Sequence, residues 1–444
     1  MGRVYFGTDG IRGRVGEHPM TVDFALRLAS AAGRVLAPQG GAVLIGKDTR
    51  LSGYMFEAAL EAGFVAAGVN VMMMGPLPTP GIAYMTRRLK CNFGVVISAS
   101  HNLFEDNGIK FFDSSGGKLS DELEEQIEAQ LEAPPVTRSS GELGRARRVD
   151  NTRVQYQEFC RSTLPEGVDL AGLKIVVDCA NGAAYKVAPR TLADLGADIV
   201  PIGSSPNGRN INVGCGSTSP ELLQLTVPGV NAQAGIALDG DGDRVLMVDH
   251  LGRVVDGDQL LYIIACARQA QGTLAGPVVG TLMSNLGLEL ALRERGIAFE
   301  RAAVGDRYVL ARLRETGGVL GGETSGHILC LDRTTTGDGL VSALQVLAVM
   351  RASGKSLAEL AAGMARFPQV MLNVRVAQRF DPSTVPAVRT LLGTLESQLG
   401  GRGRIVLRPS GTEPLIRVMV EAQEEALARG CAERLAEAVR AVGA

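Results

Sequence analysis

The sequence predicts an α/β protein built from three related units and a smaller C-terminal α+β unit. A strand–helix–strand pattern of about 30 residues, the length of a βαβ crossover, occurs in three successive copies. Each copy is followed by a further strand that ends in a polar loop, and the end of the chain has a different order of elements. These observations together favour three α/β domains, each of which contributes one polar loop.

The first unit contains the most informative of these loops. The apolar run Val95 to Ile97 predicts a buried strand, which stops at the polar segment Ser98–Asn102. An Asn-Gly turn signal then opens another strand, with Lys110 within it. A hydroxyl held between two rigid strands could act as a nucleophile or phosphate carrier, although an ordinary serine-rich turn would look the same in isolation. The elements expected in this unit are strands at 42–45, 68–74, 94–97 and 109–112, and a helix at 55–67.

The second and third units repeat this order. In the second, the polar loop is Asp239–Asp243, and in the third it is Gly322–His327. A short apolar run precedes and follows each loop, as expected for two paired strands. The second unit has strands at 174–178, 196–203, 235–238 and 245–248 with a helix ending at 195, and the third has strands at 277–280, 296–300, 318–321 and 328–331 with a helix at 286–295.

The C-terminal unit has no βαβ pattern. It combines strands at 370–376, 404–408 and 415–420 with helices at 382–399 and 424–442. Elsewhere, a charged helix at 120–133 is expected to present a solvated face, and the apolar run 339–350 is expected to be a core helix. The predicted domains are 1–150, which carries the serine loop, 151–252, which carries the aspartate loop, 253–367, which carries the sugar-binding loop, and 368–444, which binds phosphate.

Composition excludes several classes of protein. The formal net charge of −2 argues against a strongly basic nucleic-acid binder. The seven cysteines are odd in number and include no C-x-x-C pair, which favours reduced thiols in a cytoplasmic protein. The first residues lack the apolar stretch of a secretory signal. We therefore expect no nucleic-acid or membrane partner.

The loop of alternating aspartate and glycine predicts a metal site. Asp239, Asp241 and Asp243 repel one another unless a cation neutralises them, and oxygen ligands favour Mg²⁺ or Mn²⁺. An EF-hand needs Gly at loop position 6 and Glu at position 12, where this chain has Arg244 and His250. Strands rather than helices also flank the loop, so we reject an EF-hand. An acidic turn without a metal is the remaining alternative.

Three further loops offer polar groups that suit a sugar phosphate. Around the turn 409–414, guanidinium groups, hydroxyls and free N–H groups suit a phosphate monoester, although a solvated hairpin tip would look similar. The segment 322–327 offers an acceptor, a hydroxyl and an imidazole, which suit sugar hydroxyls. The glycine-rich segment 7–13 carries one arginine and is a weak signal alone. The candidates in these three loops are Arg408, Ser410, Gly411, Thr412 and Arg417; Glu323, Ser325 and His327; and Arg12.

The motifs F-G-T-D-G-I-R-G, I-S-A-S-H-N, D-G-D-G-D-R, G-E-T-S-G-H and R-P-S-G-T-E-P occur in this order across almost the whole chain. Together they resemble the α-D-phosphohexomutase superfamily. The segment 304–309, V-G-D-R-Y-V, and the chain length resemble its bacterial branch that acts on glucosamine phosphates. One departure is Leu103, because the superfamily usually has Pro after S-H-N.

The resemblance implies four domains around a central cleft and assigns a role to each motif. Ser100 would be the phosphoserine, with Ser98 its neighbour rather than the nucleophile. Lys110 is the first choice for proton transfer. By the same resemblance, Ser100, Asp239, Asp241 and Asp243 would bind the metal; Arg12, His101, Lys110, Arg244 and His327 would line the reaction centre; Glu323 and Ser325 would bind the 3- and 4-hydroxyls; and Arg408, Ser410, Gly411, Thr412 and Arg417 would hold the non-reacting phosphate.

The implied reaction interconverts glucosamine 6-phosphate and glucosamine 1-phosphate, a step toward UDP-N-acetylglucosamine and the cell wall. The implied cofactors are one Mg²⁺ per chain, phosphoserine at Ser100, and a hexosamine or glucose 1,6-bisphosphate as intermediate and activator. A small-molecule sugar phosphate is the expected partner, with a homodimer as one candidate assembly. The alternatives are a phosphoglucomutase/phosphomannomutase, a metal-dependent sugar phosphatase, and a sugar-phosphate sensor without catalysis.

Overall fold

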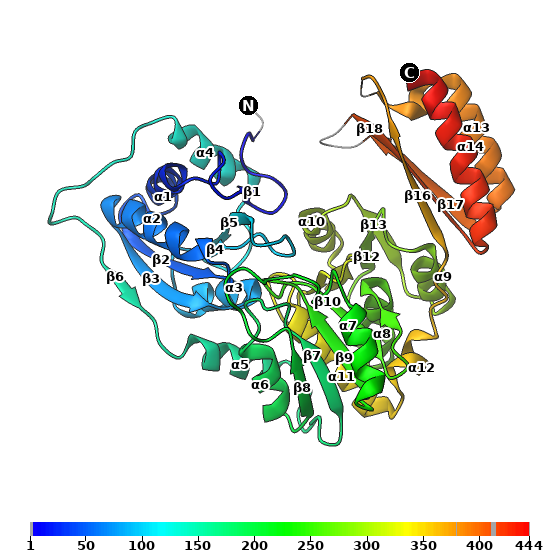
Figure 1. Ribbon diagram of the computed structural model, residues 1–444, viewed down its shortest axis with the longest axis horizontal. Coiled ribbons are helices and arrows are strands. Elements are labelled where there is room, and N and C mark those ends of the chain that lie inside the picture. Colours follow the sequence, from blue (N-terminus) through cyan, green and yellow to red (C-terminus); the bar gives the residue numbers. More distant parts are fainter. Residues whose placement is uncertain (1–2, 379, 410–413, 444) are drawn as a thin grey trace.

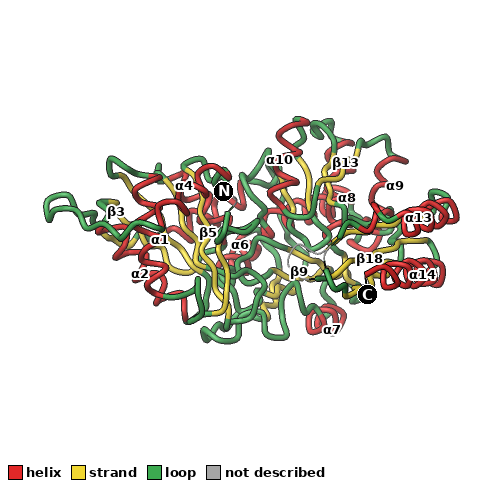
Figure 2. The backbone as a smooth tube through the Cα atoms, turned by 90° about the horizontal axis from the view of Figure 1, so that it is seen from above, coloured by secondary structure: helices red, strands yellow, loops and turns green. Residues whose placement is uncertain are grey.

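The computed structural model describes residues 3–378, 380–409 and 414–443 of the chain. It contains four separate sheets arranged along the longest axis of the molecule, with the N-terminal sheet at one end and the C-terminal sheet at the other (Figure 1). Seen from above, α1, α2 and β3 lie toward one end of this axis, and α13 and α14 lie at the other (Figure 2). Within the described part of the chain, no helix has the length and apolarity needed to cross a membrane.

The first sheet has six strands in the order β1-β5-β4-β2-β3-β6. Strands β2, β3, β4 and β6 are mutually parallel, whereas β5 runs antiparallel to both β4 and β1. The β4–β5 pair brings the predicted serine loop to the edge of the sheet where the parallel strands end. The elements are β1 (Ile11–Arg14), α1 (Val22–Leu36), β2 (Gly41–Lys47), α2 (Ser52–Ala66), β3 (Val69–Pro76), α3 (Thr79–Arg88), β4 (Phe93–Ile97), β5 (Asp106–Asp113), α4 (Asp121–Leu131) and β6 (Ala146–Arg148).

The second sheet has five strands in the order β11-β10-β9-β7-β8. The antiparallel pair β9–β10 carries the aspartate loop at its turn, in the same topological position as the serine loop. The elements are α5 (Thr152–Ser162), β7 (Lys174–Asp178), α6 (Val187–Asp194), β8 (Asp198–Ile202), α7 (Glu221–Gly229), β9 (Ala234–Leu238), β10 (Val245–Asp249) and β11 (Val254–Val255).

The third sheet has four strands in the order β13-β12-β14-β15. Its β14–β15 hairpin carries the third polar loop. The elements are α8 (Gly257–Ala270), β12 (Val278–Thr281), α9 (Leu286–Glu294), β13 (Phe299–Ala302), α10 (Asp306–Thr316), β14 (Leu320–Gly322), β15 (Ile328–Cys330), α11 (Gly339–Ser353) and α12 (Leu357–Ala361).

The fourth sheet is entirely antiparallel, in the order β16-β18-β17. Figure 1 shows helices α13 and α14 on its outer face, while the opposite face points toward the rest of the molecule. The elements are β16 (Gln369–Arg375), the 3₁₀ helix η1 (Pro382–Thr384), α13 (Pro386–Leu399), β17 (Gly403–Pro409), β18 (Leu415–Ala422) and α14 (Glu425–Gly443). This arrangement confirms the predicted class of three α/β repeats and a C-terminal α+β unit.

One large hydrophobic cluster is shared by the first three units, each of which also has a cluster of its own. One cluster of buried side chains includes Leu44 and Ile82 of the first unit, Ile175 of the second and Leu344 of the third. The C-terminal unit has a core of its own, which lies between residues 370 and 439. Burial of apolar surface therefore joins three units into one body, whereas the fourth unit attaches to that body mainly through polar contacts.

Two features differ from the prediction. The β-strand at 11–14 and the helix at 22–36 were not predicted, and the strand carries Arg12, one of the predicted site residues. The charged helix α4 is not simply solvated, because Glu124 is buried and pairs with Arg3 and Arg307. The carboxylate of Glu128 accepts hydrogen bonds from three successive N–H groups, beginning at Val4.

We expect the buried hydrogen bond between Tyr156 and Asp338 to stabilise the shared core. The Tyr156 hydroxyl donates to Asp338 Oδ2 at 2.8 Å, and both side chains are buried. Tyr156→Phe leaves a buried carboxylate oxygen unpaired, which should lower the free energy of unfolding by about 1–3 kcal/mol. Urea denaturation measures this loss. Tyr308→Phe, at a half-exposed position, is the matched control, and equal stability of the two variants would contradict the assignment.

Candidate active site

The N-terminal glycine-rich segment, the end of the aspartate loop and the third polar loop meet around one cavity of about 440 Å³. Each of the first three units contributes charged side chains to its wall. The fourth sheet contributes none among the described residues. The lining consists of Tyr5, Gly7, Thr8, Asp9, Gly10, Arg12, Asp243, Arg244, Val304, Gly305, Asp306, Glu323 and His327.

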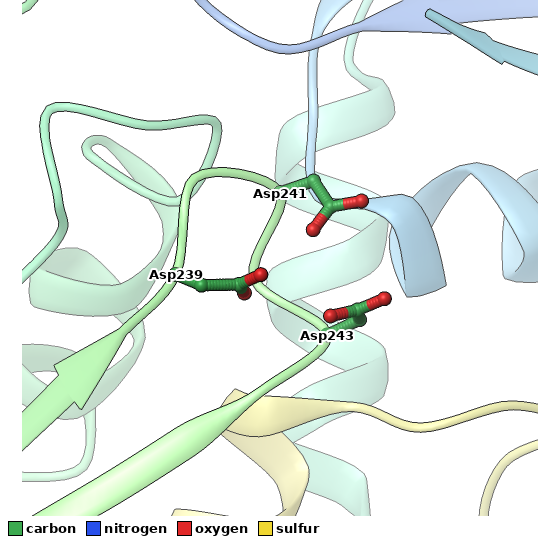
Figure 3. A group of neighbouring side chains, drawn as sticks. All are labelled: Asp239, Asp241 and Asp243. Atoms are coloured by element: carbon green, nitrogen blue, oxygen red, sulfur yellow. The ribbon is translucent and has the colours of Figure 1, made fainter. Parts of the chain in front are cut away.

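The aspartate loop forms a compact carboxylate cluster beside this cavity. Asp239, Asp241 and Asp243 each present an oxygen, and these three oxygens lie within 4.8 Å of one another. Figure 3 shows the three carboxylates, carried by the turn between β9 and β10, converging on a common point. Asp241 Oδ1 and Asp243 Oδ1 are buried without a hydrogen-bond partner among the described residues. An oxygen-only donor set with unpaired buried atoms fits a small divalent cation such as Mg²⁺.

The electrostatics of the cluster are consistent with this fit. Burial, together with the neighbouring carboxylates of Asp243 and Asp241, raises the pKa of Asp239 well above its ordinary value. For Asp243, burial also favours the protonated form, but Lys110 and His327 outweigh it and lower the pKa. The cluster is therefore only partly neutralised by protein cations, and Asp239 is the member that most lacks positive charge.

Ser100 lies directly against this least compensated carboxylate. Its hydroxyl donates to Asp239 Oδ2 at 2.6 Å, and its side chain is buried. Its backbone has φ of +54°, a left-handed conformation that is uncommon for residues other than glycine. The N–H of Ser100 donates to Ser98 Oγ, and the Ser98 hydroxyl donates to Asp48. Ser98 thus supports the loop and does not face the aspartate cluster.

A buried arginine fixes the rest of this loop. Arg50 is fully buried and pairs with Asp48 through its Nε atom at 2.8 Å. Its two Nη atoms donate to four backbone carbonyls of the serine loop. Asn212 of the second unit donates to two of the same carbonyls, those of Ser100 and Asn102, at 2.9 Å each. The left-handed turn at Ser100 is therefore held from both sides. The four carbonyls bound by Arg50 belong to Ser100, Asn102, Leu103 and Asp106.

Six alternating charges from three units form a closed ring, and four of its members line the cavity. Lys110 Nζ lies 2.8 Å from both Asp241 and Asp9, and 3.6 Å from Asp243. Lys118 bridges Asp9 at 2.6 Å and Asp306 at 2.5 Å. The ring closes through His327 of the third unit, whose imidazole lies 3.2 Å from Asp306 and 3.7 Å from Asp243. The members in order are Asp243, Lys110, Asp9, Lys118, Asp306 and His327.

The ring determines the charge of its basic members. Burial alone would lower the pKa of His327, but Asp306 and Asp243 outweigh it and raise the pKa to about 9. The same competition raises the pKa of Lys110, where Asp241 and Asp9 outweigh burial. Both groups are therefore cations at neutral pH in this arrangement.

The other predicted members of the reaction centre lie nearby. His101 Nδ1 is 3.5 Å from the Ser100 hydroxyl, and burial together with Arg244 and Arg12 lowers the His101 pKa to about 4. That imidazole is neutral at neutral pH. Arg12 pairs with Asp9, and the Nε atoms of Arg12 and Arg244 have no hydrogen-bond partner within the described part of the chain. Both guanidinium groups are available to an anionic ligand.

The predicted sugar-binding loop, residues 322–327, is only partly in the cavity. Glu323 lines it, and its Oε1 atom accepts the N–H of Gly305 at 3.0 Å. Ser325, predicted beside it, is exposed at the tip of the loop and is not part of the lining. Leu103, the departure from the superfamily pattern, is 49 % exposed, and its carbonyl is one of those bound by Arg50.

The predicted phosphate-binding residues lie in the fourth unit, away from this cavity. Arg408 of β17 stands directly opposite Arg417 of β18. Like charges in this cross-strand position repel, and no ion pair with a carboxylate relieves them among the described residues. Burial and Arg417 lower the pKa of Arg408. The other three predicted members, Ser410, Gly411 and Thr412, lie outside the described residues.

Several functional residues were not predicted from the sequence. Asp9 lies in the motif F-G-T-D-G-I-R-G, in which only Arg12 was predicted as a site residue. Arg50 lies in the polar loop after β2, and Asp306 lies in the segment 304–309 that marks the branch. Lys118 and Asn212 carry no local signal. Long-range pairing, which the sequence does not reveal, gives these five residues their positions.

Comparison with protein families gives four matches that follow one another along the chain. They are described as phosphoglucomutase/phosphomannomutase alpha/beta/alpha domain I, over residues 3–136; domain II, over 156–252; domain III, over 256–367; and the C-terminal domain, over 371–438. The matches cover most of the chain and include each polar loop described above.

Curated relatives match over the full length. The chain is 59% identical to the phosphoglucosamine mutase of Thioalkalivibrio sulfidiphilus over 446 residues, which covers 100% of this chain and 99% of that protein. It is 60% identical to the phosphoglucosamine mutase of Halorhodospira halophila, with 98% of this chain and 96% of that protein covered.

Solved structures show the same fold. A phosphoglucomutase/phosphomannomutase family protein from Burkholderia thailandensis superimposes with a TM-score of 0.81 at 25% identity, covering 98% of this chain and 97% of that one. An N-acetylphosphoglucosamine mutase from Aspergillus fumigatus, solved with GlcNAc-6P and magnesium, superimposes with a TM-score of 0.71 at 20% identity, covering 100% and 96%.

We expect a divalent cation to stabilise the folded protein through the aspartate cluster. A ligand that binds only the native state adds about 2.7 kcal/mol at a concentration 100 times its Kd. After treatment with EDTA, added Mg²⁺ should therefore raise the thermal midpoint by several degrees, and Asp241→Asn should remove most of this rise. Glu166→Gln, at an exposed position, should retain it. The site assignment would be wrong if Asp241→Asn responded like the unaltered protein.

Proposed function

Because the chain belongs to the phosphoglucomutase/phosphomannomutase family, we propose that it interconverts glucosamine 6-phosphate and glucosamine 1-phosphate as a phosphoglucosamine mutase. The observation that carries this proposal is the full-length identity of 57–60% with curated phosphoglucosamine mutases. The product would feed the synthesis of UDP-N-acetylglucosamine in the cytoplasm. The partner is a small sugar phosphate, and the domain limits remain those proposed from the sequence, 1–150, 151–252, 253–367 and 368–444.

Ser100 is the proposed carrier of the phosphoryl group. In the first half-reaction the P–Oγ bond of phosphorylated Ser100 breaks and a P–O1 bond to the sugar forms. A proton passes in net terms from the sugar hydroxyl to Ser100 Oγ, and the proposed carrier is the Lys110 cation, which gives its own proton to Oγ and regains one from the hydroxyl. The product is a 1,6-bisphosphate, which returns its 6-phosphoryl group to Ser100 in the second half-reaction. A bisphosphate of glucosamine or glucose therefore also serves as activator.

The proposed metal ligands are Asp239, Asp241, Asp243 and the phosphate carried by Ser100. When bound, Mg²⁺ neutralises charge on the phosphoryl group that is transferred. The surrounding cations complete this neutralisation and position the group, which is the main contribution of a protein to phosphoryl transfer. The proposed residues at the reaction centre are Arg12, His101, Lys110, Arg244 and His327.

Both orientations of the bisphosphate must fit one site. Glu323 and Ser325 are proposed to bind the 3- and 4-hydroxyls, which lie near the axis about which the sugar turns. Arg408 and Arg417, with Ser410, Gly411 and Thr412, are proposed to hold whichever phosphate is not reacting. A site that recognises these shared features accepts the intermediate in either direction.

The substrate test compares kcat/KM for the 6-phosphates of glucosamine, glucose and mannose under one set of conditions, each with a matching 1,6-bisphosphate. We expect glucosamine 6-phosphate to lead, with slow turnover of glucose 6-phosphate. If glucose or mannose leads, the chain is a general phosphohexomutase. If inorganic phosphate accumulates instead of the 1-phosphate, the chain is a phosphatase.

The carrier test separates the two serines of the loop. Ser100→Ala should abolish mutase activity and remove a phosphate adduct from the intact mass, because no hydroxyl then faces Asp239. Ser98→Ala should retain the adduct and lose less activity, since Ser98 Oγ bonds the loop backbone and Asp48. The reverse order would assign the carrier role to Ser98.

A further inference from the structure

The first turn of helix α8 packs directly against the sugar-binding loop. The N–H of Gly257 donates to the carbonyl of Thr324 at 3.1 Å. A Cβ atom at Gly257 would lie 2.2 Å from the carbonyl oxygen of Glu323. Only glycine allows this approach, so the position of the loop is set by the start of α8.

The carboxylate of Asp258, in the same turn, joins this loop to a second one. Asp258 is fully buried, and its Oδ2 atom accepts the hydroxyl of Thr324 at 2.7 Å and the N–H of Asn285 at 2.8 Å. Its Oδ1 atom has no hydrogen-bond partner among the described residues. One oxygen therefore holds two segments that are far apart in the sequence, and Asp258 does not line the cavity.

The second of these segments holds the linker to the C-terminal unit. The side-chain amide of Asn285 donates to the carbonyl of Phe367 at 2.9 Å and accepts its N–H at 3.0 Å. Arg366 Nε lies 3.3 Å from Asp256, the residue that caps α8. The N–H of Ala422 in β18 donates to the carbonyl of Pro368. The linker is thus fixed to the start of α8 just before it enters the fourth sheet.

The C-terminal unit also contacts the segment just before Asn285 directly. Arg404 of β17 donates to the carbonyls of Leu282 and Ser284, and its Nε atom pairs with buried Glu421. These contacts lie on the strand that carries Arg408 four residues later. A chain of hydrogen bonds therefore runs from Thr324, the neighbour of Glu323, through Asp258 and Asn285 to Phe367, at the start of the unit that carries the arginine pair.

We propose that Asp258 is a positioning residue that holds the sugar-binding loop in register with the C-terminal unit, and so sets the distance between Glu323 and the arginine pair. This inference rests on the proposed function, in which the two ends of one substrate bind to these two places. When two binding points are correctly spaced, the second contact forms within one complex and strengthens the first. Loss of register weakens binding without removing any group that contacts the substrate.

The test is a double-mutant cycle on KM for glucosamine 6-phosphate with Asp258→Ala and Arg417→Ala. A misplacement of about 1 Å can cost up to about a hundredfold. We expect Asp258→Ala to raise KM about tenfold or more, with a smaller change in kcat. In the Arg417→Ala background the same substitution should have little further effect, because the distant contact is already lost.

The conservative variant separates the hydrogen bonds from the charge. Asp258→Asn can place its carbonyl oxygen where Oδ2 lies, and its amide where Oδ1 has no partner, so its KM should stay close to the unaltered value. Thr324→Val removes one donor and keeps the side-chain shape, so it should also raise KM. If Asp258→Ala fails to fold, Thr324→Val replaces it in the test. Thermal unfolding shows which variants are folded.

Three results would overturn the inference: an unchanged KM in folded Asp258→Ala and Thr324→Val, an equal effect of Asp258→Ala with and without Arg417, or a loss in Asp258→Asn as large as in Asp258→Ala. Failure of the proposed function is distinguishable, because the unaltered protein would then prefer another hexose 6-phosphate. The same cycle would be measured with that preferred substrate.

Discussion

The closed ring of alternating charges is the constraint on which the site depends. Each carboxylate of the ring lies between two cations, and each cation between two carboxylates, so no member is left buried without a partner. Removing one partner from a buried ion pair is costly, because the other charge remains in a poorly solvated place. The three units therefore have one relative position in which all six charges are satisfied, and that position also creates the cavity.

The serine loop depends on this arrangement in a second way. Its left-handed backbone at Ser100 needs support from its surroundings, since such conformations persist only where other contacts impose them. Arg50 supplies that support from the first unit, and Asn212 supplies it from the second. The hydroxyl consequently reaches Asp239 only when both units are in place, so Ser100 and the aspartate cluster take up their positions together.

The parts of the fold that could be predicted were those with local patterns. Strand–loop–strand segments around Ser100, Asp239 and Glu323 were found because each is a short apolar run that ends in polar residues. The ring could not be found in this way: Lys118 and Asp306 are 188 positions apart, and each alone resembles a surface charge. The helix at 120–133 was predicted as solvated for the same reason, because the arginine partners of Glu124 lie far from it in the sequence, at positions 3 and 307.

The ring also has a consequence for the order of events during synthesis. Translation delivers Asp9, Lys110 and Lys118 first, then Asp243, and only afterwards the last two members, at positions 306 and 327. Domains generally fold as they emerge from the ribosome, beginning at the N-terminus. Until the third unit has emerged, Lys118 has one of its two carboxylate partners and the cavity lacks one wall. A nascent chain interrupted before that point holds Ser100 and the aspartate cluster but lacks the wall of the cavity that the third unit supplies.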